Sequence, residues 1–218
     1  MNDAGLRLWF RQVYVDSDSL PSTRTVRTVQ QGSGPWLWRS VCRAWPVFQV
    51  WTQESVAALA ALLQELGSRQ VLEVGAGDGR LTRALQAEGR SRGFAVTGQD
   101  DGSWGQALPG SELRHPVAPL RQEDYRASLA AVQPDTVVVS WMPYEEDWTP
   151  AFRACPAVRS YLLIGEDNGG CTGADSQWTP GPGWTLQEVE AFRHVSCSSL
   201  DASPTWGATG LWLARRPA

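Results

Sequence analysis

Three glycines at alternating positions follow an acidic residue in the run Glu-Val-Gly-Ala-Gly-Asp-Gly at residues 73–79. Glycine has no Cβ, so Gly75, Gly77 and Gly79 can adopt a positive φ and let the backbone approach a ligand closely. An apolar run precedes the motif and an amphipathic run begins at Leu81, an order that predicts a strand, a tight turn and a helix. The first N–H groups of such a helix are free and carry a partial positive charge, so they can contact a polar ligand.

The glycine spacing distinguishes two classes of ligand. A dinucleotide fingerprint reads G-x-G-x-x-G, whereas this motif reads E-x-G-x-G-x-G, which speaks against a nucleotide-binding oxidoreductase. The motif resembles the first motif of the class I S-adenosylmethionine-dependent methyltransferases. This resemblance implies that the loop passes under the methionine part of the cofactor and that Glu73 contacts its ammonium group. The expected cofactor-binding residues of the motif are Glu73, Gly75, Ala76, Gly77, Asp78 and Gly79. The alternative is an ordinary strand-turn-helix connection of an α/β protein.

A second carboxylate is expected at the end of the next strand. Asp100 lies 23 residues after Gly77. In nucleotide-binding α/β folds, an acid about 20 residues past the glycine loop accepts hydrogen bonds from ribose hydroxyls. Asp100 is the first choice for this role and Asp101 the substitute, with a plain turn as the alternative. By the same family resemblance, Asp124 and Tyr125 are expected near the adenine amino group, although Asp124 is equally well suited to cap a helix.

The continuous β-branched run at residues 135–140 indicates a strand buried on both faces, hence a parallel sheet. Ligands of open α/β sheets bind at the carboxyl ends of the strands. We therefore expect Ser140 to contact the cofactor and the following loop to bind the methyl acceptor. The expected catalytic residues are Trp141, Tyr144, Asp147 and Trp148, of which Asp147 and Trp148 should touch only the acceptor.

Aromatic rings and carboxylates in this loop would suit a cationic or amine acceptor. Core tryptophans and a solvated helix start are the alternative explanation. The loop stands where amino-group methyltransferases carry N-P-P-Y, but here Trp-Met replaces the first two residues. Oxygen and carbon acceptors therefore remain open. A methyltransferase-like fold that binds cofactor or a partner protein without catalysis is the alternative function.

Periodicity and the resemblance together predict an α/β fold. We expect a Rossmann-like, seven-stranded and mostly parallel sheet with helices on both faces and a C-terminal β-hairpin. The expected helices are 52–67, 81–88, 126–131 and a short one within 184–192; the expected strands are 70–74, 94–98, 113–118, 135–140, 160–165, 193–200 and 210–215. Trp104 could stack on adenine or cap the core. His115 has no assigned role, and His194 is expected on an edge strand.

Residues 1–50 are expected to form an N-terminal arm or lid, and residues 51–218 the methyltransferase-like domain. The weak alternation at 6–15 predicts a short strand, the polar residues 17–34 predict a mobile loop, and Pro35 begins a helix to residue 43. Trp36 and Trp38 could close the pocket from one side. The long loop 169–183, anchored by Trp178, should close it from the other. The sequence thus predicts an enclosed, aromatic-lined pocket for a small molecule or a single side chain.

Composition excludes several classes of protein. The 218 residues carry a net charge of −4, and all 19 cationic side chains are arginine, without a basic run, so duplex nucleic acid is not an expected partner. No signal peptide and no apolar run of transmembrane length is visible. The four cysteines form no C-x-x-C pair, which argues against a metal site and for reduced thiols in the cytoplasm. The expected partner is a small-molecule or peptide methyl acceptor; the oligomeric state is not indicated.

Overall fold

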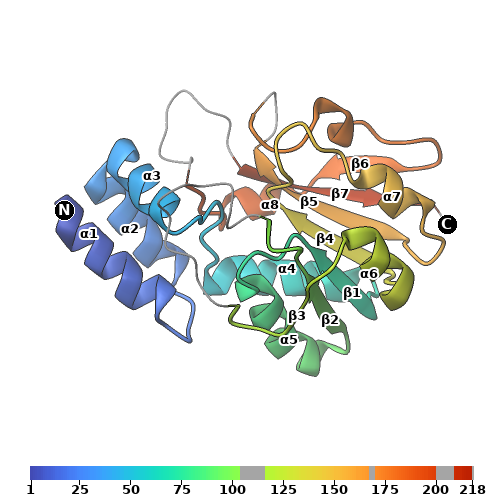
Figure 1. Ribbon diagram of the computed structural model, residues 1–218, viewed down its shortest axis with the longest axis horizontal. Coiled ribbons are helices and arrows are strands. Elements are labelled where there is room, and N and C mark those ends of the chain that lie inside the picture. The colour runs from blue at the N-terminus through green and yellow to red at the C-terminus, as the bar shows by residue number, and fades with distance from the viewer. Residues whose placement is uncertain (104–115, 167–169, 200–208, 218) are drawn as a thin grey trace.

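The computed structural model describes residues 1–103, 116–166, 170–199 and 209–217. Within them, seven strands form one sheet in the order β3-β2-β1-β4-β5-β7-β6 (Figure 1). The strands are β1 (Gln70–Val74), β2 (Ala95–Gln99), β3 (Leu120–Arg121), β4 (Thr136–Ser140), β5 (Ser160–Glu166), β6 (Thr185–Glu188) and β7 (Thr209–Arg215). The first five pair in parallel, and β7 runs antiparallel to both β5 and β6. The predicted mostly parallel α/β sheet is confirmed.

Helices cover both faces of the sheet, as predicted. One face packs against α4 (Gln53–Glu65), α5 (Arg80–Arg92) and α8 (Glu190–Arg193), and the other against α6 (Tyr125–Val132) and α7 (Thr149–Ala154). The central strand β4 serves both cores, because Val138 points to one and Val139 to the other. The predicted helix at 52–67 is α4, capped by the Thr52 side chain, which accepts a hydrogen bond from the Ser55 N–H.

The N-terminal segment is helical, and the predicted strand at 6–15 and mobile loop at 17–34 are wrong. The chain forms α1 (Asp3–Phe10), a π-helical turn η1 (Arg11–Val15), α2 (Thr23–Ser33) and α3 (Pro35–Ala44), which lie together at one end of the molecule (Figure 1). The apolar residues that suggested alternation include Leu6, Phe10 and Tyr14, which are four residues apart and share one helical face. All three are buried in a third core with Trp38 and Cys197.

Long-range hydrogen bonds hold the polar helix α2 and the helix α3 in place. Side chains of Gln30 and Trp38 donate to the backbone oxygen of Ser198, at 3.3 and 2.9 Å. The Ser22 side chain caps α2 by accepting a bond from the Thr25 N–H. The tertiary contacts of Gln30 and Trp38, together with the local cap at Ser22, therefore support helices that local composition does not indicate.

The last part of the sheet also differs from prediction. Residues 184–192 contain most of a short helix, α8, as predicted, but they also contain the strand β6, which was not predicted. The predicted strand at 193–200 is absent from its described residues, where Ser198 makes only an isolated bridge to Gln49. The antiparallel partner of β7 is thus the earlier segment β6. His194 follows α8 in a turn. Of the predicted third strand at 113–118, the described residues 116–118 form no strand, and β3 lies just after them. Residues 113–115, which include His115, and Trp104 lie outside the described residues.

Candidate active site

The glycine loop after β1 adopts the backbone conformation that its sequence predicts. Gly75, Gly77 and Gly79 have φ values of 68°, 58° and 75°, in the left-handed region that favours glycine. A Cβ on Gly79 would lie 3.2 Å from the Cβ of Ala118, so a side chain at this position would also be crowded by its neighbour. The Ala76 N–H donates to the Gln99 oxygen at 2.9 Å and fixes the loop against the end of β2.

Glu73, at the end of β1, is buried beneath this loop and borders a cavity. Burial raises the pKa of Glu73 to about 8; a hydrogen bond from the Thr82 hydroxyl lowers it, and the charges of Asp78 and Asp100 raise it further. The carboxyl group is therefore mostly protonated at neutral pH. A cation entering the cavity would favour its charged form.

Asp100 lies directly behind the glycine loop, whereas Asp101 faces solvent. The Asp100 carboxylate accepts hydrogen bonds from the backbone N–H groups of Gly77 at 2.8 Å and Gly102 at 2.7 Å. Burial raises the pKa of Asp100, and these two bonds lower it. The exposed Asp101 instead accepts a bond from Ser103 N–H at 2.8 Å, and bonds to Ser103 lower its pKa. Of the two acids, Asp100 is therefore the one that contacts the glycine loop, although it is not among the residues that line the cavity over this loop.

A cavity of about 120 Å³ opens over the glycine loop at the carboxyl edge of the sheet. Three parts of the chain line it. The loop contributes residues 75–78 with Glu73, the end of β4 contributes Ser140 and Trp141, and the N-terminal segment contributes Tyr14, Trp51 and residues 46–49. The N-terminal segment thus forms a wall of the site, but through residues other than those expected, because Trp36 is 82% exposed and Trp38 is buried in the N-terminal core.

Ser140 and Trp141 occupy the position predicted for chemistry. Trp141 has a φ of 60°, donates from Nε1 to the Gln49 side-chain oxygen at 3.3 Å, and stacks on Phe48 with 5.6 Å between ring centroids. The Ser140 hydroxyl oxygen is buried and has no hydrogen-bond partner among the described residues. Ser140 is also one of the residues that line the cavity.

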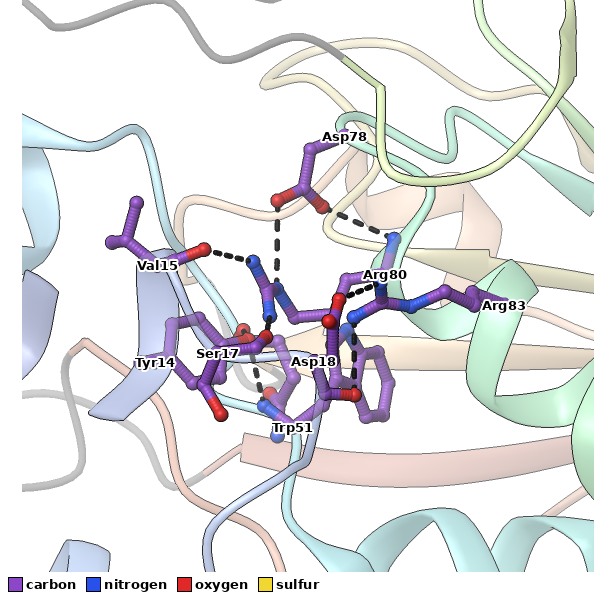
Figure 2. Close-up of polar contacts among 9 residues, drawn as sticks. Tyr14, Val15, Ser17, Asp18, Trp51, Asp78, Arg80 and Arg83 are labelled. Carbon is purple, nitrogen blue, oxygen red and sulfur yellow. Dashed lines mark hydrogen bonds and ion pairs between the residues drawn. The ribbon is translucent and has the colours of Figure 1, made fainter. Parts of the chain in front are cut away.

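Sequence reasoning missed Arg80, the first residue of α5. Figure 2 shows its side chain extending from the glycine loop to the N-terminal segment. The guanidinium donates to the Val15 oxygen at 3.1 Å, lies 4.6 Å from the Tyr14 ring centroid and has its Nε 3.5 Å from an Asp78 carboxylate oxygen. An arginine at a helix start is ordinarily exposed, so no local pattern reveals this contact.

Tyr14 continues the connection toward the cavity (Figure 2). Its hydroxyl donates to the Gln49 backbone oxygen at 3.2 Å and accepts from the Trp51 N–H at 3.0 Å. Arg80 and Tyr14 together therefore couple the position of the N-terminal wall to the start of α5.

The order of the strands in the sheet identifies the type of fold. Strand β7 is inserted antiparallel between β5 and β6, the ending that the resemblance to class I methyltransferases implies. The sheet therefore has the Rossmann-like α/β architecture that this resemblance predicts. No protein-family model matches the chain, and no curated protein sequence matches it.

Solved structures with a similar fold include methyltransferases. The methyltransferase domain of bacterial CtHen1-C is 13% identical over 76% of this chain and 98% of its own, with a TM-score of 0.44. An SAM-dependent methyltransferase from Archaeoglobus fulgidus is 11% identical over 74% and 94%, with a TM-score of 0.40. The mitomycin 7-O-methyltransferase MmcR is 12% identical over 100% and 69%, with a TM-score of 0.42. Such distant similarities leave the reaction to be inferred from the site itself.

Of the four predicted catalytic residues, Trp141 alone is among the described residues that line the cavity. Tyr144 is 65% exposed. Asp147 has its carboxylate engaged by the Thr149 N–H at 3.0 Å, by the Thr149 hydroxyl at 2.6 Å and by the Ser176 hydroxyl at 2.7 Å. Asp147 therefore holds the start of α7 and the neighbouring loop together.

Trp148 lies against the other side of the glycine loop. Its ring stacks on Tyr125 with 4.9 Å between centroids and stands 3.3 Å from the position that a Cβ on Gly75 would take. Tyr125 is buried, and its hydroxyl has no hydrogen-bond partner among the described residues. Asp124 is the N-cap of α6, accepting a bond from the Arg126 N–H at 2.8 Å. The helix-capping alternative for Asp124 is thus the one observed.

The described part of the loop at 169–183 lies beside the loop that follows β4, as predicted. The Gly173 N–H donates to the Met142 oxygen at 2.9 Å, and the Ala174 N–H donates to the Glu146 oxygen at 2.7 Å. Trp178 packs on Trp212 with 6.1 Å between ring centroids. These contacts fasten the described residues of the loop to the sheet. Among the described residues, no cluster of three or more side chains suited to a metal ion occurs, and no helix is long and apolar enough to cross a membrane.

Proposed function

We propose that this protein is an S-adenosylmethionine-dependent methyltransferase that acts on a small molecule or a single side chain. The observation that carries the proposal is the buried carboxyl of Glu73, which borders a cavity beneath three glycines of positive φ. A buried acid with a raised pKa gains most from a cationic ligand. The methionine part of the cofactor supplies such a cation as its ammonium group.

The residues around the loop suit the remaining parts of the cofactor. The glycine loop would lie against the methionine part, and Asp100 would accept hydrogen bonds from the ribose, because its oxygens can accept bonds beyond those from Gly77 and Gly102. The cofactor would supply an activated methyl group on a sulfonium. Trp141, Phe48 and Tyr14 provide aromatic faces that attract cations and exclude water from the cavity.

Methyl transfer requires alignment of the acceptor more than an enzymic nucleophile. The unpartnered Ser140 hydroxyl can hydrogen-bond a polar atom of the acceptor and fix its direction. Because the N-terminal segment walls the cavity, a small molecule or one side chain fits better than an extended surface. An amine acceptor is less well supported, because it would need a carboxylate in the cavity. The Asp147 carboxylate is hydrogen-bonded to Thr149, and the exposed Glu145 and Glu146 do not line the cavity.

We also propose that the protein works in the cytoplasm. None of the four cysteines forms a disulfide bond, which agrees with a reducing environment such as the cytoplasm. A protein that binds the cofactor without catalysis is the alternative, and it shares the dependence on Glu73. A methyl-transfer assay separates the two, because only the catalytic protein transfers label from the cofactor to an acceptor.

Calorimetric titration tests the cofactor assignment directly. S-adenosylmethionine, S-adenosylhomocysteine and NAD are titrated into wild type, Glu73→Gln and the exposed-acid control Asp101→Asn. Wild type and Asp101→Asn should bind the first two ligands and not NAD, while Glu73→Gln should bind about tenfold or more weakly.

Proton linkage supplies a second readout of the same titrations. At neutral pH, cofactor binding to wild type should release most of one proton from Glu73, because burial holds its pKa near 8 before the cation arrives. Titrations in buffers of different ionisation enthalpy measure this release. It should be absent from Glu73→Gln. Equal affinities and equal proton release in wild type and Glu73→Gln would contradict the assignment.

A further inference from the structure

A second cavity, of about 110 Å³, lies beside the cofactor-side cavity. It is lined by Arg39 and Arg43 of α3, by residues 46–48, and by Cys171 and Ser199. Residues 46–48 also line the first cavity, so one short segment separates the two. Phe48, in this segment, is 43% exposed and stacks on Trp141. An apolar surface therefore connects the second cavity with the end of β4.

The charged side chains among the described residues that line the second cavity are two arginines. Arg39 and Arg43 are four residues apart on α3, so their side chains project from the same helical face. Among the described residues, the Glu166 carboxylate neighbours this cavity, because it accepts a hydrogen bond of 2.9 Å from the Cys171 N–H. Arginine is suited to carboxylate and phosphate groups, which its planar fork can bind through two parallel hydrogen bonds.

Cys171 in this cavity is not set up as a nucleophile. Burial, followed by the hydrogen bond and charge of Glu166, raises the pKa of the Cys171 thiol to about 11. The thiol is therefore protonated at neutral pH, whereas reactive cysteines are thiolates. Recognition of charge, not covalent chemistry, is the use to which these residues are suited.

We propose that the second cavity binds an anionic group, a carboxylate or a phosphate, of the methyl acceptor, whose apolar body lies along Phe48 and Trp141. This inference rests on the proposed methyltransferase function and narrows its substrate to small organic acids. Arg39 and Arg43 bind the acidic end, and Ser140 orients the end that receives the methyl group. The acceptor is thus distinguished from neutral and cationic molecules of the same shape.

Ligand-observed NMR tests this with four probes of similar shape and different charge: benzoate, phenyl phosphate, benzamide and benzylamine. The protein is saturated with S-adenosylhomocysteine, and the probes are added up to about 10 mM, the range expected for fragments of this size. The variants are Arg39→Gln/Arg43→Gln and the charge-matched control Arg24→Gln/Arg90→Gln, whose arginines are exposed elsewhere.

At least one of the two anions should bind wild type and the control, more tightly than benzamide does. Binding should weaken about tenfold or more in Arg39→Gln/Arg43→Gln, as expected for lost charge-assisted hydrogen bonds. The stronger of the two anions identifies the acidic group. The inference is overturned if neither anion binds wild type, if both double variants bind the anions equally, or if benzylamine binds best.

The S-adenosylhomocysteine titration separates this inference from the proposed function. Arg39 and Arg43 do not line the cofactor-side cavity, so their double variant should bind S-adenosylhomocysteine as wild type does. If wild type binds S-adenosylhomocysteine but binds neither anion, only the proposed acceptor site is rejected. Failure of wild type to bind it rejects the proposed function.

Discussion

The Asp100 carboxylate accepts a hydrogen bond of 2.8 Å from the backbone N–H of Gly77, in the centre of the glycine loop. This bond joins the loops that follow two neighbouring parallel strands, β1 and β2. It holds the loop in one conformation, and the carboxylate keeps lone pairs for a further donor. The same side chain can therefore organise the protein and contact a ligand.

Replacing Asp100 should separate these two roles. Asp100→Ala leaves the N–H groups of Gly77 and Gly102 without their partner, so the free energy of unfolding should fall by about 1–3 kcal/mol. Asp100→Asn retains an acceptor oxygen and should recover most of this loss in a urea titration. Both variants should bind S-adenosylmethionine more weakly than wild type. Full cofactor affinity in Asp100→Asn would show that the ribose does not contact this carboxylate.

Glu73→Gln should make the ligand-free protein more stable at alkaline pH. Burial raises the pKa of Glu73 to about 8, above its value in the unfolded chain, so the folded state binds more protons between these two values. Stability therefore falls as pH rises through this range. The wild type should lose about 2 kcal/mol relative to Glu73→Gln between about pH 6 and about pH 8.5.

Thermal unfolding of both proteins across this range measures the difference. The gap between their melting temperatures should widen with pH. A pH-independent gap would mean that Glu73 is already charged in the folded protein. If Glu73→Gln is more stable than wild type but binds the cofactor poorly, Glu73 is a residue retained for function at a cost in stability.

Gly77→Val should abolish cofactor binding, because it places a β-branched side chain at a φ of 58° beside the ligand. Gly67→Val is the matched control: Gly67 has a φ of 67°, and no heavy atom lies within 4 Å of the added Cβ. Both variants should lose about 1–3 kcal/mol from backbone strain. Calorimetry should show normal cofactor affinity in Gly67→Val only. If Gly77→Val binds normally while folded, the loop does not contact the cofactor.

Trp148→Ala should weaken cofactor binding as well as turnover, contrary to the expectation that this residue touches only the acceptor. Its ring packs on Tyr125 and supports Gly75 at the start of the loop. Asp147→Asn should instead cost about 1 kcal/mol of stability, because it weakens the hydrogen bonds that the carboxylate accepts from the Thr149 N–H and hydroxyl, with little effect on cofactor affinity. Binding and denaturation measured on both variants distinguish the two effects. An unchanged cofactor affinity in Trp148→Ala would restore the acceptor assignment.

Arg80→Met should destabilise the protein by about 3 kcal/mol, because it removes an ion-pair partner of the partly buried Asp78 and a donor to the Val15 carbonyl. Arg83→Met is the control. Arg83 also pairs with the N-terminal segment, through Asp18 at 3.0 Å, but the Asp18 side chain is fully exposed, so the cost should stay below about 1 kcal/mol. Equal destabilisation by both substitutions would show that Arg80 is not the main link between the N-terminal segment and the start of α5.

Local sequence determined the central half of the fold. The run at 70–79 combines a β-branched and apolar strand with glycines that readily adopt the required positive φ, so the strand and the turn followed from it. The β-branched run of β4 likewise predicted a strand buried on both faces. Asp100 could also be located from the sequence, because its position is set by the length of the connection between the neighbouring parallel strands β1 and β2.

Tertiary structure decided what local patterns leave ambiguous. The helices of residues 1–44 contain many polar residues, and they form because Leu6, Phe10 and Trp38 share a core that no neighbouring sequence reveals. Strand β6 exists because β7 offers it backbone partners, since edge-strand pairing depends on a segment far along the chain. Rings and carboxylates after β4 were equally suited to a pocket or to structural roles. Packing placed Trp141 at the cavity, Trp148 behind the glycine loop and Asp147 at a helix start, because each side chain's surroundings come from distant segments.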